Sequence, residues 1–76
     1  MEMKDQSYVV CIENSGSPAS LELRKIYIRL SDPQAEADGF WRVIDESGED
    51  YLFPARFFAA IEVPESAEPL FAVRAV

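Results

Sequence analysis

The sequence predicts a small all-β domain built from five short strands. Its 76 residues are enough for a single domain, and 49% of them are hydrophobic. Runs rich in aromatic and β-branched residues recur at short intervals, and clusters of Gly, Pro, Asn, Asp and Ser separate them. We expect a thin core, because a chain of this size buries only about 60% of its unfolded surface.

The first strand is expected over residues 8–12, Tyr-Val-Val-Cys-Ile, a short run rich in β-branched residues. Residues 1–7 before it are polar and are expected to form a flexible N-terminus. Residues 14–18, Asn-Ser-Gly-Ser-Pro, are a dense cluster of turn formers and predict a loop after this strand.

The second strand is expected over residues 21–30, where hydrophobic and charged residues alternate. The alternation slips by one position at residues 24–25, which indicates a bulge or a tight bend there. A helix is the competing interpretation of this segment, because Leu23, Ile26 and Leu30 also fit a period of 3.6 residues.

A short helical turn is expected near residues 32–38, between the second and third strands. Asp32 can cap the helix with its side chain, and Pro33 fits the first helical position. Gly39 can end the helix in a left-handed conformation.

The third and fourth strands form a predicted hairpin, with residues 40–46 as its first strand and 51–53 as its second. Residues 45–50, Asp-Glu-Ser-Gly-Glu-Asp, are expected to form a solvated turn, with Gly48 at a positive φ. Along the third strand, alternation divides the side chains between two faces: Trp41, Val43 and Asp45 on one, and Phe40, Arg42 and Ile44 on the other.

Proline marks the end of this hairpin. Pro54 has no N–H and cannot continue a central strand, so residues 54–57 are expected to form one 3₁₀ turn. The last strand is expected over residues 59–63. The predicted domain therefore covers residues 8–63, and residues 64–76 form a C-terminal tail that could dock on it.

Charge and composition exclude several kinds of partner. The net charge is −7, from 14 acidic and 7 basic residues, so we expect no binding to nucleic acid or to anionic membranes. No apolar run approaches the about 20 residues that span a bilayer, and residues 1–7 lack the apolar core of a signal peptide. The chain has one cysteine, which suits the reducing cytoplasm. A cytoplasmic protein with a neutral or basic protein or peptide partner is predicted.

No pattern in the sequence indicates catalysis. The chain has no histidine, the commonest general base and zinc ligand. The acidic turn at 45–50 lacks the spacing of a calcium loop, and Cys11 stands in an apolar run typical of a core residue. We predict no enzyme, no catalytic residue, no metal site and no cofactor.

Three segments carry a resemblance to the SH3-like barrels. Residues 19–30 are similar to the Glu-Leu-Ser-Phe-x-x-Gly-Asp stretch of that family and its following strand. Residues 39–43, Gly-Phe-Trp-Arg-Val, resemble Gly-Trp-Trp-x-Ala/Val, and residues 52–58, Leu-Phe-Pro-Ala-Arg-Phe-Phe, resemble Tyr-Ile-Pro-Ser-Asn-Tyr-Val. Residues 45–54 are also similar to a segment of small uncharacterised bacterial proteins, Asp-Glu-Ser-Gly-Glu-Asp-Tyr-Leu-Tyr-Pro.

The resemblance implies a five-stranded SH3-like barrel with an aromatic groove for proline-rich peptides. Residues 10–14, Val-Cys-Ile-Glu-Asn, lack both tyrosines of the corresponding Ala-Leu-Tyr-Asp-Tyr motif, and Tyr51 stands where the family has glycine. The residues that match groove positions of the family are Phe40, Leu52, Pro54 and Phe57.

Two functions are therefore predicted. The first is a protein-interaction or regulatory domain that binds through the aromatic face or through an open edge near residues 8–12. The alternative is a structural or accessory subunit that acts through homo-oligomerisation or an operon-encoded partner, with the apolar residues 70–76 as the docking element.

Overall fold

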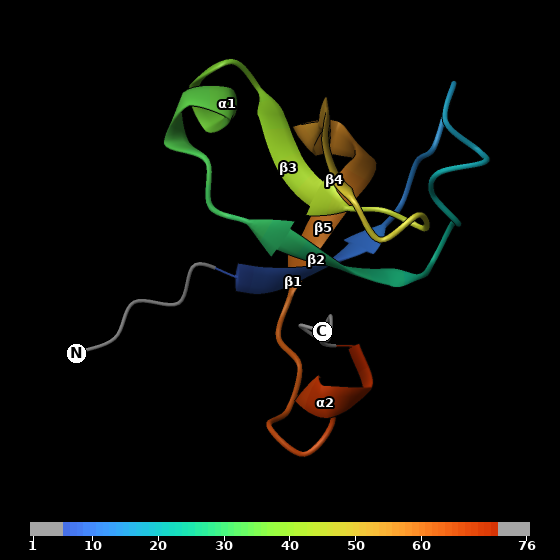
Figure 1. The fold of residues 1–76 in the computed structure, drawn as a ribbon, viewed down its shortest axis with the longest axis vertical. Coiled ribbons are helices and arrows are strands. Elements are labelled where there is room, and N and C mark those ends of the chain that lie inside the picture. The colour runs from blue at the N-terminus through green and yellow to red at the C-terminus, as the bar shows by residue number, and fades with distance from the viewer. Residues whose placement is uncertain (1–5, 72–76) are drawn as a thin grey trace.

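Five antiparallel strands form one sheet in the computed structural model, which describes residues 6–71 (Figure 1). The predicted all-β fold is confirmed. The strands are β1 (Gln6–Cys11), β2 (Ile26–Leu30), β3 (Phe40–Ile44), β4 (Asp50–Pro54) and β5 (Phe58–Ile61).

Short helical segments connect and follow the strands. Helix α1 (Pro33–Ala37) lies between β2 and β3, and the 3₁₀ turn η1 (Ala55–Phe57) leads from β4 into β5. Both confirm predicted turns. Asp32 caps α1 as expected, because its Oδ1 accepts a hydrogen bond of 3.1 Å from the N–H of Ala35. A second helix, α2 (Glu68–Phe71), follows β5.

The order of the strands is β4-β3-β2-β1-β5, so β1 lies inside the sheet between β2 and β5. The predicted open edge near residues 8–12 is therefore wrong, because the backbone of β1 pairs on both sides. The two free edges of the described sheet belong to β4 and β5.

The predicted strand over residues 21–30 begins only at Ile26, and the helix considered for the same segment is absent. A tight bend lies where the hydrophobic alternation slips, since Arg24 has a φ of 67° and its N–H donates to the C=O of Cys11 at 2.7 Å. Side chains bind the backbone before the bend: Asn14 donates to the C=O of Leu21. Because these backbone groups have partners outside the sheet, the segment needs no strand pairing.

The bounds of β1, β3, β4 and β5 also differ from the prediction. β4 (Asp50–Pro54) is longer than the expected 51–53, and Pro54, which was expected in the 3₁₀ turn, is its last residue. β1 begins at Gln6, which includes two residues that were expected in the flexible N-terminus. β3 ends at Ile44, and the Asp45 side chain accepts a hydrogen bond from the backbone of the following turn. β5 runs from Phe58 to Ile61 and is thus shifted toward the 3₁₀ turn from the expected 59–63.

The core lies between the two halves of the sheet, which folds so that β3 and β4 cross over β5 (Figure 1). Phe58 is at the centre of its aromatic part: its ring stacks on Trp41 with centroids 6.2 Å apart and meets the edge of Phe53 at 6.1 Å. The buried residues of this core come from every strand, from the loop before β2 and from η1: Val9, Cys11, Leu21, Tyr27, Val43, Phe53, Phe57 and Phe58.

The C-terminal segment lies on the opposite side of the sheet from this core. Helix α2 contacts β2 and lies below the sheet in Figure 1. Ile28, which points away from the core, is only 2% exposed. Leu70 on α2 is 80% exposed, and residues 72–76 of the predicted docking element lie outside the described residues.

Candidate functional site

Three of the four predicted groove residues lie together on one face of the β3–β4 hairpin. Phe40 is 40% exposed and Leu52 46% exposed, and half-buried Pro54 lies directly opposite Phe40 on the neighbouring strand. We call these three residues the outer patch, because they lie on the side of the hairpin that faces away from the core. Phe57 is 3% exposed and belongs to the core, so it does not join them.

Local backbone geometry brings the outer patch together. Gly39 has a φ of 85°, a left-handed conformation that favours glycine, and it turns the chain from α1 into β3. Its C=O accepts a hydrogen bond of 2.9 Å from the N–H of Ala55, which joins the start of β3 to the end of β4. Phe40 and Pro54 are therefore direct cross-strand neighbours.

The free edge of β4 beside the outer patch offers few hydrogen-bond donors. The pairs at the two ends of the β3–β4 ladder are hydrogen-bonded, with Ala55 N–H donating to Gly39 and Asp45 N–H donating to Glu49. Hydrogen-bonded pairs alternate along an antiparallel ladder, so three residues of β4 direct their backbone groups away from β3: Asp50, Leu52 and Pro54. Since proline has no N–H, the outer edge is interrupted at one of these positions.

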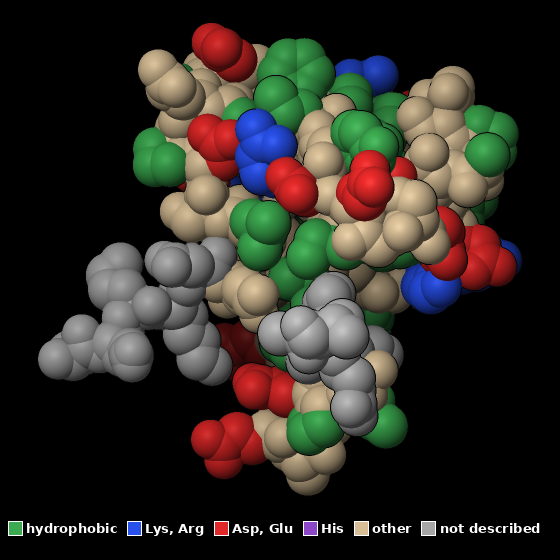
Figure 2. Space-filling model, in the orientation of Figure 1, with side chains coloured by type: hydrophobic (Ala, Val, Ile, Leu, Met, Phe, Trp, Pro, Cys, Tyr) green, Lys and Arg blue, Asp and Glu red, His purple; other side chains and the backbone are tan. Residues whose placement is uncertain are grey.

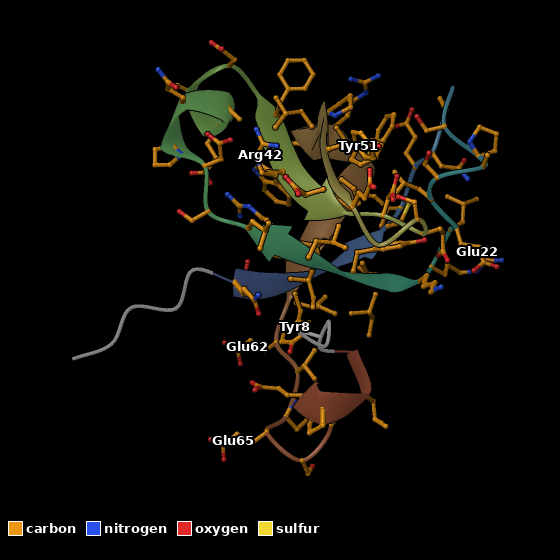
Figure 3. The ribbon with its side chains drawn as sticks, in the orientation of Figure 1. Tyr8, Glu22, Arg42, Tyr51, Glu62 and Glu65 are labelled. Carbon is orange, nitrogen blue, oxygen red and sulfur yellow. The ribbon has the colours of Figure 1, made fainter. Side chains whose placement is uncertain are left out.

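Arg42 lies opposite Leu52 and brings two carboxylates to the outer patch (Figure 3). Its Nε is 2.8 Å from Asp32 Oδ2 and its NH1 is 2.9 Å from Asp50 Oδ2. Hydrogen bonds from the Ala35 N–H and from Arg42 hold the pKa of Asp32 below its ordinary value. One cation faces two anions here, so the border of the outer patch carries net negative charge.

A pocket of ≈ 390 Å³ opens on the other side of β4 from the outer patch. Neighbouring residues of a strand point to opposite faces, so Tyr51 and Phe53 face the pocket while Leu52 faces the outer patch. The lining combines hydroxyl, carboxylate and aromatic groups: Ser20, Asp45, Ser47, Tyr51 and Phe53.

Asp45 is the buried charge of this pocket, with only 8% of its surface exposed. The N–H and hydroxyl of Ser47 both donate to its Oδ1, at 2.8 and 2.5 Å. The expected solvated turn is correct for residues 46–50 but wrong for Asp45. The signal was present in the sequence, because alternation places Asp45 on the same face as the buried Val43.

A hydrogen-bond network joins the loop before β2 to the turn after β3. The hydroxyl of Tyr27 donates to Glu46 Oε2 and accepts from the N–H of Glu22 at 2.7 Å. Lys25 Nζ is 2.6 Å from the same carboxylate oxygen, and the N–H of Glu46 donates to the C=O of Ser20. Burial and then the bond to Glu46 raise the pKa of Tyr27, so this hydroxyl stays protonated as a donor.

We expect the Glu46 contribution to stability to be lost in acid. Hydrogen bonds from Lys25 and then Tyr27 lower the pKa of Glu46. A carboxyl whose pKa is lower in the folded state stabilises that state fully above its unfolded pKa, about 4.3, and less as the pH falls through the folded pKa. Thermal unfolding of Glu46→Gln should therefore show a smaller drop in Tm below about pH 4.3 than the parent.

Glu65→Gln is the control for this measurement, because Glu65 is exposed and points away from the sheet (Figure 3). It removes the same charge without touching the network. Equal acid profiles for the two variants would contradict the assignment to Glu46.

Chemically reactive groups are scarce in the described part of the chain. Cys11 is 0% exposed, and burial raises the pKa of its thiol, which disfavours the reactive thiolate. Among residues 6–71, no three cysteine or carboxylate side chains come together as a metal site. Within the same range no helix has the length and apolar character to cross a bilayer.

The outer patch and the pocket are thus two distinct surfaces on opposite sides of β4, one apolar and one polar with aromatic walls. Comparison of the chain with family models, with curated proteins and with solved structures finds no match.

Proposed function

We propose that this chain is a cytoplasmic, non-enzymatic interaction domain of SH3-like architecture, and that it binds an apolar, basic polypeptide segment at the outer patch. The five antiparallel strands, the bend at Arg24 and the η1 turn before β5 support this architecture. The observation that carries the function is the exposure of Phe40 and Leu52 beside Pro54 on one face.

Side-chain geometry makes the outer patch suitable for an extended peptide. Phe40 and Pro54 are rigid, and rigid apolar ridges lose little entropy when a polyproline-type segment docks on them. Leu52 extends the apolar surface along β4. Because the edge of β4 is interrupted by proline, recognition relies on side chains rather than on addition of a strand.

Charge selects the partner. The chain carries a net charge of −7, and Asp32 and Asp50 flank the outer patch around a single arginine. Figure 2 shows acidic side chains spread among hydrophobic ones over the face in view. A segment that combines apolar residues with lysine or arginine complements this surface, and opposite charge accelerates its association.

The test is a titration of ¹⁵N-labelled protein with a basic proline-rich peptide, compared with an acidic peptide of the same length. We expect amide shifts centred on Phe40 and Leu52 with the basic peptide. Phe40→Ser should weaken binding about tenfold or more, since a central aromatic contact contributes about 2 kcal/mol.

Leu23→Ser is the matched control, because Leu23 is 44% exposed and lies outside the outer patch. It removes a similar apolar surface and should leave the affinity unchanged. Absence of shifts with both peptides, or equal losses for the two variants, would refute the proposal. The alternative role in homo-oligomerisation stays a prediction that the exposed Leu70 favours.

A further inference from the structure

We propose that the pocket beside Asp45 binds the cationic side chain of a lysine or arginine supplied by a partner polypeptide. This site is separate from the outer patch, since it opens on the other side of β4. Three properties of its lining support the assignment: an unneutralised buried carboxylate, aromatic walls and hydroxyl acceptors.

The carboxylate of Asp45 lacks a cation. Both of its hydrogen bonds go to Oδ1, from Ser47, and over residues 6–71 no hydrogen bond or ion pair reaches Oδ2. The nearby Lys25 is engaged by Glu46 at 2.6 Å. Asp45 as a residue is only 8% exposed, and a carboxylate in such a place is stabilised by a counter-charge. A cation entering the pocket therefore gains an interaction that the folded chain does not supply.

Oδ2 remains accessible from the pocket. In the described structure, every side-chain oxygen or nitrogen that is fully buried has a hydrogen-bond partner. Because Oδ2 of Asp45 has no partner, it is not fully buried and keeps contact with open space. Alternation directs the Asp45 side chain to the same side of the hairpin as Tyr51 and Phe53, which line the pocket with it. The free oxygen and the aromatic rings therefore face one volume.

The rings favour an organic cation over a metal ion. Phe53 is 7% exposed and belongs to the core, whereas Tyr51 is 48% exposed. The Tyr51 hydroxyl donates to Glu49 Oε1 at 2.8 Å, which holds its ring in place. Ammonium and guanidinium groups are attracted to aromatic faces, and their N–H groups can donate to carboxylate and hydroxyl oxygens together.

The pocket has room for such a group. Its ≈ 390 Å³ is more than ten times the about 30 Å³ that one water molecule occupies in the liquid. A guanidinium or ammonium head with its last methylene groups fits this space, and the lining includes two serines, Ser20 and Ser47, whose hydroxyl oxygens can accept hydrogen bonds.

The experiment titrates the ¹⁵N-labelled full chain at low ionic strength with N-acetyl-arginine amide and N-acetyl-lysine amide. N-acetyl-citrulline amide, which has the shape of arginine without its charge, is the ligand control. We expect shifts at Ser47 and Tyr51 with the two cations and none with citrulline, and the larger of the two responses identifies the preferred residue.

Asp45→Asn keeps the acceptor for Ser47 but removes the charge, so the turn should persist. It should weaken cation binding about tenfold or more, as expected for loss of a charge-assisted hydrogen bond. Glu65→Gln changes the net charge equally at an exposed residue outside the pocket lining, so it should have a much smaller effect. If Asp45→Asn does not fold, Tyr51→Ser serves instead, because its ring is half exposed.

Equal shifts for arginine and citrulline derivatives would overturn the assignment, as would equal losses for Asp45→Asn and Glu65→Gln. A Phe40→Ser variant should bind these cations normally. The proposal for the pocket and the proposal for the outer patch can therefore be refuted independently of each other.

Discussion

Phe58→Ala should destabilise the protein by about 3–5 kcal/mol, the range for removal of a buried phenylalanine side chain. Phe58 is 5% exposed and its ring contacts Trp41, Phe53 and Phe57. Its loss leaves a cavity between the two halves of the sheet that short strands cannot close. Because domains of this size are only marginally stable, much of the variant should be unfolded at 25 °C.

Urea denaturation followed by far-UV circular dichroism measures this effect, with the fluorescence of Trp41, the single tryptophan, as a second probe. Phe40→Ala is the control, since Phe40 is 40% exposed on the outer side of the hairpin. It should cost less than about 1 kcal/mol. A loss below about 1 kcal/mol for Phe58→Ala would show that the core does not depend on this ring.

Tyr27→Phe should have the second largest effect, a destabilisation of about 1–3 kcal/mol. The substitution keeps the buried ring, which is 5% exposed, and removes only the hydroxyl. The N–H of Glu22 then loses its acceptor and Glu46 loses a donor. The cost arises because a partly buried backbone donor is left without a partner.

Tyr51→Phe provides a matched control for the hydroxyl. Tyr51 also donates to a glutamate, Glu49 at 2.8 Å, but its side chain is 48% exposed, so water replaces the lost partner. Its free energy of unfolding should change by less than about 0.5 kcal/mol. If the two variants lose equal stability, the network around Tyr27 does not join the loop to the turn.

Local chemistry made several elements predictable from the sequence. The start of α1 is marked by Asp32, which caps it, and by Pro33, its first helical residue. Its end is marked by Gly39 in a left-handed conformation. Each of these residues influences only the backbone next to it, and α1 lies where they indicate. Gly48 has the expected positive φ of 86° for the same reason. Such signals depend on the backbone of one segment and need no knowledge of its neighbours.

Features that depend on distant segments were not predictable. Leu21 and Leu23 alternate like strand residues, yet Leu21 is 0% exposed and Leu23 is 44% exposed in a loop whose backbone binds side chains elsewhere. Phe57 follows Pro54 in sequence, but the 3₁₀ turn η1 directs it into the core. Strand alternation does not continue through such a turn, so the position of this ring depends on the tertiary fold.

The interrupted edge of β4 has a consequence for self-assembly. The sheet has two free edges on different strands, β4 and β5. If β5 of one copy paired with β4 of the next, the contact could repeat from copy to copy and build a fibre. Pro54 has no N–H, so only Asp50 and Leu52 of β4 could donate at such a junction, and the charged side chain of Asp50 opposes it further. The residue that completes the outer patch thus also limits polymerisation of the chain.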